Sequence, residues 1–153
     1  MTAPDTGSAP LTGRPPRRSA GRAQAPIVAV VALGGGLGAT ARYAVSLRWP
    51  AAPDGFPWAT FWINVVGCAV IGVLLVAVTE VRPAHPLVRP FFGTGVLGGF
   101  TTFSTYAVEI RHLLDAGRLA TAFAYLAATL CAALAAVWLA AVAARRLLTG
   151  WRR

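Results

Sequence analysis

The sequence predicts an all-α integral membrane protein with four transmembrane helices, the third of them broken near its middle. Of its 153 residues, 56% are hydrophobic and only 12% are charged, whereas soluble domains carry about 25% charged residues. Four apolar runs each have the ~20 residues that span a bilayer core: residues 27–47, 58–79, 88–110 and 119–144. Glycine and hydroxyl residues interrupt the third run. No length remains for a soluble catalytic domain, so we do not expect an enzyme.

The charges lie mostly outside the apolar runs. The net charge is +9, and arginine is the only strongly basic residue type in the chain. A basic protein can bind nucleic acid, but arginines in tails and in loops between apolar runs indicate membrane topology instead. We expect a disordered basic tail over residues 1–25, a membrane channel domain over 26–146 and a basic C-terminal tail over 147–153.

The distribution of arginine predicts the orientation in the cell membrane. If loops alternate between two sides, ten arginines lie on the side of both termini and three on the other. The positive-inside rule then places both termini in the cytoplasm. The ten are Arg14, Arg17, Arg18, Arg22, Arg82, Arg89, Arg145, Arg146, Arg152 and Arg153, and the three are Arg48, Arg111 and Arg118.

In the first apolar run, Gly34 and Gly38 share a helix face and allow another backbone to approach closely. Arg42 lies one turn further along this face. An arginine within a membrane segment is costly unless it meets water or a partner. Arg42 is therefore either a snorkelling anchor near the membrane edge or a vestibule residue that attracts anions.

Residues 34–39 imitate a dinucleotide fingerprint without its strand–turn–helix context, and the arginine pair at 17–18 imitates a twin-arginine signal.

In the second run, Asn64 is the only strongly polar side chain between Phe61 and Val78. Its amide donates and accepts hydrogen bonds. Asn64 therefore either bonds another helix, which stabilises packing modestly, or donates to an anion in a pore. Cys68 and Cys131 both fall within apolar runs, where we expect packing residues and no disulfide or metal site.

The third run contains the predicted break. Residues 98–102 can unwind, because glycine weakens a helix and hydroxyls can bond their own backbone. Broken backbone at membrane depth is tolerated only where it is buried in protein or lines a water-filled path. Carbonyl oxygens freed by the break suit a small cation such as Na⁺. Beyond it, Phe103 and Tyr106 lie three residues apart on one face, where their rings either pack or offer positive edges to a small anion.

The fourth run carries a polar stripe, in which Thr121, Tyr125 and Thr129 recur every four residues. Hydroxyl groups in a helix often bond only the preceding turn. A stripe of three turns that includes a tyrosine also suits a face in contact with water. Both interpretations remain open from the pattern alone.

Three segments in this order resemble the Fluc-type (CrcB) fluoride channels: GGGLGATARY at 34–43, TFWINVVG at 60–67 and GGFTTFST at 98–105. The resemblance covers nearly all of residues 27–144. It implies a fluoride-specific channel subunit that lets cytoplasmic fluoride leave the cell passively and so protects the cell from fluoride. It also implies an antiparallel dimer in the bilayer, with two pores along the subunit interface.

The resemblance further implies which residues form the sites. Asn64 would donate to fluoride, and Phe103 and Tyr106 would present ring edges to the ion. A structural Na⁺, not transported, would be held by the backbone carbonyls of Gly98 and Thr101 from both subunits. The other residues implied for the path carry hydroxyl groups: Ser104, Thr105, Tyr125 and Thr129.

Two positions depart from the family pattern, and one acid has no firm role. Tyr106 stands where the motif usually has a second phenylalanine, so its hydroxyl adds a polar group beside one fluoride site. Ala133 stands where the polar stripe often continues with a hydroxyl. Glu109 matches an acid that follows the aromatic pair in the family.

Other functions remain as alternatives. A small multidrug-type exporter also uses four helices, but it needs a membrane carboxylate for proton coupling, and the first run has none. A non-transporting membrane subunit would not need the break or Asn64. Within the channel family, an antiparallel homodimer requires insertion in both orientations. The arginine count of ten against three favours one orientation, so we expect either a homodimer or a heterodimer with an oppositely oriented paralogue.

Overall fold

The computed structural model describes residues 18–50, 55–81 and 85–150, with side chains for 24–50, 55–80 and 85–148. Within these residues, every regular element is helical. Two of the elements, η1 and η2, are π-helical. In chain order the elements are α1 (Arg18–Arg48), α2 (Trp58–Val76), η1 (Ala77–Val81), η2 (Arg89–Leu97), α3 (Gly98–Phe100), α4 (Ser104–Asp115) and α5 (Leu119–Gly150).

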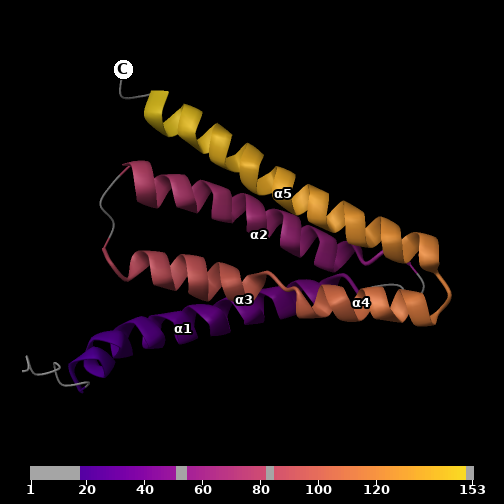
Figure 1. Cartoon of the computed structure of the whole chain (residues 1–153), viewed down its shortest axis with the longest axis horizontal. Helices are drawn as coiled ribbons and strands as arrows, with labels where there is room; N and C mark the ends of the chain where they lie inside the picture. The colour runs from indigo at the N-terminus through magenta and orange to yellow at the C-terminus, as the bar shows by residue number, and fades with distance from the viewer. Residues whose placement is uncertain (1–17, 51–54, 82–84, 151–153) are drawn as a thin grey trace, which may run out of the picture.

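The helices lie in two layers that are inclined to each other and converge toward the end of the molecule where α4 lies (Figure 1). In one layer α2 and α5 pack side by side, and in the other η2 and α3 lie along α1. After α3 the chain continues into α4, which packs against α5. The start of α1 and the end of α5 lie at the same end of the molecule.

Among the described residues, three helices are long and apolar enough to cross a membrane: Gln24–Arg48, Trp58–Glu80 and Leu119–Leu148. They coincide with three of the four predicted runs, and the chain is a multi-pass membrane protein. The third predicted run, residues 88–110, is divided among η2, α3 and α4. Each of these is shorter than the ~20 residues that a continuous helix needs to span a bilayer core.

The chain leaves the helix later than the sequence predicted. Gly98–Phe100 are helical, Thr101 is extended with φ −72° and ψ 155°, and α4 begins only at Ser104. The prediction that residues 98–102 unwind was therefore wrong in its boundaries. The physical reason is packing: a Cβ on Gly99 would lie 3.0 Å from the Gly35 Cα, so glycine serves close contact with α1 here. The backbone turns away at the threonines.

Helix α1 also begins before the predicted domain boundary at residue 26. Residues 18–25 are helical, and alanine at positions 20, 23 and 25 favours this state. At the other end, α5 continues through residues 147–150, which were predicted as tail. The predicted disordered segment 1–17 and the C-terminal residues 151–153 lie outside the described residues, as does Arg82.

The predicted close approach at Gly34 and Gly38 is confirmed. A Cβ on Gly34 would lie 2.6 Å from the Phe91 carbonyl oxygen, and one on Gly38 would lie 2.8 Å from the Phe100 nitrogen. Both contacts are with backbone atoms of the η2–α3 segment. This face of α1 therefore supports the segment that leads directly into the break.

A tight turn returns the chain from α4 to α5. Gly117 has φ 71°, a conformation that glycine adopts without steric cost. Its N–H donates to the Leu114 carbonyl at 2.9 Å, and Arg118 N–H donates to the Leu113 carbonyl at 2.8 Å. These two bonds form a Schellman motif. The turn brings α5 back along α4, and this places Tyr125 beside Glu109.

Candidate functional site

Asn64 on α2 holds the backbone of the break. Its Nδ2 donates to the Thr102 carbonyl at 3.0 Å, and its Oδ1 accepts from Thr102 N–H at 2.9 Å. Asn64 is buried, with 8% of its surface exposed. The side chain therefore replaces the helical partners that Thr102 lacks, as buried backbone groups require.

The carbonyl groups of Gly98 and Thr101 lose their usual helical donors at the break. In a continuous helix each carbonyl accepts from the N–H four residues later. The donor for Gly98 would be Thr102 N–H, which bonds Asn64 instead. The donor for Thr101 would be Thr105 N–H, which donates to Thr102 Oγ1 at 3.1 Å. The carbonyl oxygens of Gly98 and Thr101, the two predicted for Na⁺, are thus released from the helical pattern.

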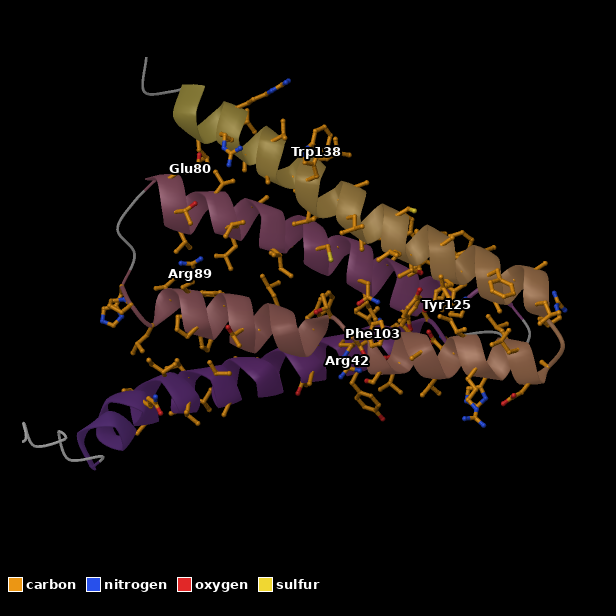
Figure 2. The ribbon with its side chains drawn as sticks, in the orientation of Figure 1. Arg42, Glu80, Arg89, Phe103, Tyr125 and Trp138 are labelled. Carbon is orange, nitrogen blue, oxygen red and sulfur yellow. The ribbon has the colours of Figure 1, made fainter. Side chains whose placement is uncertain are left out.

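Arg42 contacts the same segment from α1. Its Nε donates to the Gly99 carbonyl at 3.2 Å, and the residue is half-buried. In the view of Figure 2, Arg42 and Phe103 both lie at the junction of α3 and α4. The side chain therefore bonds the backbone beside the break. A side chain that only snorkels to the membrane edge would not make this bond.

A cavity of about 240 Å³ opens between the break, α2 and α5. It gathers four of the predicted path residues from separate parts of the chain, namely Asn64, Phe103, Tyr106 and Thr129. The Thr129 hydroxyl is buried and has no hydrogen-bond partner among the described residues. The other residues that line the cavity are Cys68, Thr101, Thr102, Leu130 and Ala133.

Ser104 and Thr105, the hydroxyl residues that follow the break, lie outside the larger cavity. Thr105 lines a second cavity of about 70 Å³, together with Arg42 and Glu109. Its Oγ1 accepts from Thr102 Oγ1 at 3.1 Å. Ser104 is exposed, and its Oγ lies 3.3 Å from Thr102 Oγ1. Neither Ser104 nor Thr105 lines the larger cavity.

Tyr125 is fully buried, with 0% of its surface exposed, and it does not line the larger cavity. Its hydroxyl donates to Glu109 Oε2 at 2.7 Å, and Thr60 Oγ1 donates to Glu109 Oε1 at 2.8 Å. Both carboxylate oxygens of Glu109 thus have donors from neighbouring helices. Glu109, to which the sequence assigned no firm role, links α2, α4 and α5. A lone acid in an apolar run was the signal that could have found it.

Tyr125→Phe is expected to lower the melting temperature of the purified protein in detergent. The variant leaves one Glu109 oxygen without its donor, and an unsatisfied buried polar group costs about 1–3 kcal/mol. The matched control is Tyr43→Phe, because Tyr43 lies on α1 with 64% of its surface exposed. Equal melting temperatures for the two variants would show that the Glu109 contact does not stabilise the fold.

The hydroxyl of Tyr106, which phenylalanine would lack, bonds a group outside the Phe103–Tyr106 pair. The hydroxyl donates to the Leu126 carbonyl on α5 at 2.8 Å. The ring centroids of Tyr106 and Phe103 lie 5.8 Å apart, and those of Tyr106 and Tyr125 lie 5.2 Å apart. The hydroxyl thus anchors the ring on α5 while the residue still lines the larger cavity.

The fold and the site together define a class of protein: a small helical membrane protein with a cavity at a helix break, lined mainly by apolar surface and by a few polar side chains. The sequence model described as CrcB-like protein, Camphor Resistance (CrcB), matches residues 29–141. This match covers most of the chain and includes all the site residues described in this subsection. The chain therefore belongs to the CrcB family.

Several relatives are similar over most of their length. The chain is 69% identical over 151 residues to fluoride-specific ion channel FluC 1 of Streptomyces coelicolor, covering 94% of this chain and 97% of the relative. It is 74% identical over 114 residues to FluC 2 of Streptomyces avermitilis, covering 74% and 72%. It is 57% identical over 119 residues to FluC 2 of Nocardia farcinica, covering 78% and 85%.

Proposed function

We propose that this chain is a subunit of a fluoride-specific ion channel that lets cytoplasmic fluoride leave the cell passively. The observation that carries the proposal is the cavity at the helix break, which brings Asn64, Phe103, Tyr106 and Thr129 together. Relatives at up to 74% identity are named fluoride-specific ion channels. The protein acts as a channel and not as an enzyme, and fluoride efflux would lower the internal fluoride concentration.

The chemistry of the cavity suits a small, strongly hydrated anion. Such an ion must exchange water for other hydrogen-bond donors, because an unpaired charge in an apolar setting is very costly. The Asn64 amide has two N–H groups, and Thr102 accepts from one of them. Thr129 contributes a buried hydroxyl, and aromatic rings have a positive edge. None of these groups carries a full positive charge, so the ion can leave as well as enter.

We also propose that η2, α3 and α4 cross the membrane together as a broken fourth span, and that two chains assemble as an antiparallel dimer. Broken backbone is tolerated at membrane depth where protein buries it. Phe103, at the end of the break, has 79% of its surface exposed in the single chain. A second subunit over this face would cover the ring and close the path.

The carbonyl groups of Gly98 and Thr101 are proposed ligands of a structural Na⁺. Their helical donors bond elsewhere, and carbonyl oxygens of broken membrane helices are suitable sodium ligands. A bound Na⁺ would be held between the broken segments of the two subunits of a dimer, and the ion would not be transported. The same two residues of the partner subunit would complete the set.

Both termini are proposed to lie in the cytoplasm. The start of α1 and the end of α5 lie at the same end of the molecule. Loop alternation in the sequence assigns ten arginines to the side of the termini and three to the other side. The imbalance favours one orientation for this chain. Relatives named FluC 2 and FluC 3 both occur in Streptomyces avermitilis, which is consistent with pairing between paralogues. Homodimer and heterodimer therefore remain the two proposed assemblies.

Fluoride efflux from liposomes is the direct test. The chain is reconstituted alone and with a co-expressed paralogue, in the presence and absence of Na⁺, and efflux is followed with a fluoride electrode. We expect flux in at least one assembly, and less flux without Na⁺. The absence of flux in every condition would refute the channel. Full flux from this chain alone would refute an obligatory heterodimer.

Phe103→Ile is expected to reduce fluoride flux strongly and leave the assembly intact. Isoleucine keeps an apolar side chain but removes the aromatic edge that faces the ion. The control is Phe92→Ile, because Phe92 lies on η2, is 46% exposed and does not line the larger cavity. Flux is measured in liposomes and assembly by size-exclusion chromatography. Unchanged flux would indicate that the Phe103 ring only packs.

A further inference from the structure

The Gly99 carbonyl is a third carbonyl group at the break that lacks its usual helical donor. That donor would be Phe103 N–H, and this N–H has no backbone acceptor within the described part of the chain. The Gly99 carbonyl instead accepts from Arg42 Nε at 3.2 Å. Gly98 and Thr101, whose carbonyls are the proposed Na⁺ ligands, lie on either side of Gly99 in the sequence. Arg42 therefore bonds a carbonyl that lies between the two that would hold the cation.

Two contacts with α1 hold residue 99, and they constrain different properties of the backbone. A Cβ on Gly99 would lie 3.0 Å from the Gly35 Cα, so packing on Gly35 sets how closely the backbone approaches α1. The bond from Arg42, about two helical turns beyond Gly35, sets the direction in which the Gly99 carbonyl points. Because the peptide group is planar, the direction of this carbonyl also affects the path of the chain toward Thr101.

The bond to Gly99 is the only hydrogen bond of the Arg42 side chain among the described residues. Arg42 is half-buried and lines the cavity of about 70 Å³ together with Glu109. Both carboxylate oxygens of Glu109 already accept from Thr60 and Tyr125. In the described part of the chain, no ion pair joins Arg42 to Glu109. The bond to the backbone of the break is therefore what fixes the Arg42 side chain.

We propose that Arg42 is a positioning residue for the cation site. Its bond to the Gly99 carbonyl holds the broken segment in the shape that lets the Gly98 and Thr101 carbonyls bind Na⁺. This inference rests on the proposed Na⁺ site. A positive charge near a cation site opposes Na⁺ binding, so Arg42 assists Na⁺ only through the geometry that it imposes. Geometry and charge therefore predict opposite effects on Na⁺ binding when Arg42 is replaced.

Two neutral variants separate the bond from the charge. In Arg42→Gln, the amide nitrogen follows Cδ, as Nε does in arginine, so a donor remains at the same distance along the side chain. In Arg42→Met, a methyl group takes this place and offers no donor. Both variants lose the positive charge, so any effect of that charge on anions is common to both. Arg48→Met is the control, because Arg48 is exposed at the end of α1.

The test is the melting temperature of each purified protein in detergent at increasing Na⁺, with N-methylglucamine keeping the ionic strength constant. A ligand that binds only the folded state raises the melting temperature. For Arg42→Met, we expect the Na⁺ concentration at half of this rise to increase about tenfold, as the loss of one hydrogen bond of typical net strength predicts. For Arg42→Gln and Arg48→Met we expect no increase. A residue that only supports the fold would lower the melting temperature equally at every Na⁺ concentration.

Fluoride efflux from liposomes is measured over the same range of Na⁺. We expect Arg42→Met to need more Na⁺ than Arg42→Gln and to match its flux at high Na⁺. Equal Na⁺ requirements for the two variants would overturn the proposal. A lower requirement for Arg42→Met than for the unmodified chain would also overturn it, because charge repulsion would then dominate.

Two further comparisons keep the outcomes distinct. If Arg42→Met does not fold, Arg42→Lys replaces it, because lysine keeps the charge but has a carbon at the position of Nε. A Na⁺ requirement equal to that of the unmodified chain would then overturn the proposal. If Na⁺ does not raise the melting temperature of the unmodified chain, the Na⁺ site is refuted together with this role of Arg42. Na⁺-dependent melting without any fluoride flux would refute the channel and leave the role of Arg42 supported by the Met and Gln difference.

Discussion

Asn64→Ala is expected to abolish fluoride flux and to destabilise the protein. The substitution removes both hydrogen bonds to Thr102, at 3.0 and 2.9 Å. It leaves a backbone N–H and a backbone carbonyl unpaired, and each such buried group costs about 1–3 kcal/mol. It also removes the free amide hydrogen that we propose for fluoride. The effect is large because one side chain supports both the shape of the break and the chemistry of the path.

The measurement combines efflux from liposomes with thermal unfolding in detergent. Thr40→Ala is the matched control, because the exposed Thr40 hydroxyl donates only to the Gly36 carbonyl of its own helix. Asn64→Asp separates the two roles. Its carboxylate can still accept from Thr102 N–H, but it offers no donor to an anion, so we expect partial stability without flux. Normal flux from Asn64→Ala would contradict both roles.

Gly38→Ala is expected to prevent normal packing of α1 on the η2–α3 segment. The added Cβ would collide with the Val96 carbonyl oxygen and would lie 2.8 Å from the Phe100 nitrogen. Backbone atoms cannot rotate aside as a side chain can, so the helices must separate. Overpacking costs about 1–3 kcal/mol and occasionally more. We expect the upper end or beyond, with little folded protein and no flux.

Gly36→Ala provides the control on the same helix. A Cβ at Gly36 meets nothing within 4 Å, and alanine is favoured over glycine in helices by about 1 kcal/mol. We therefore expect Gly36→Ala to melt at the same temperature or higher and to keep its flux. Size-exclusion profiles, melting curves and efflux distinguish the pair. Similar behaviour of the two variants would show that the contact with Val96 does not constrain the fold.

The sequence predicted the membrane helices well because length and hydrophobicity are local properties. Three predicted runs match the helices Gln24–Arg48, Trp58–Glu80 and Leu119–Leu148 within a few residues. The helical boundary at the break was predicted less well. Glycine at positions 98 and 99 weakens a helix in isolation, but contact with α1 at Gly35 holds Gly99 in the helix. A neighbouring helix therefore overrode a local preference.

The polar residues show the same division. Asn64, Phe103, Tyr106 and Thr129 were named from the sequence, and they meet in one cavity. Tyr125 was also named for the path, but its hydroxyl bonds Glu109 in the interior. The spacing of a stripe indicates which residues share a face. It does not indicate whether that face meets an ion, a cavity or another helix.

The sequence by itself determined the membrane class, the family and the chemical groups available for an anion and a cation. These follow from composition and from short motifs, which need no knowledge of distant contacts. Only the tertiary structure decided which partner each polar group takes. The Asn64–Thr102 pair spans 38 residues and the Arg42–Gly99 pair spans 57. Such pairs form because buried polar groups in a membrane must bond to protein wherever the packed helices bring partners together.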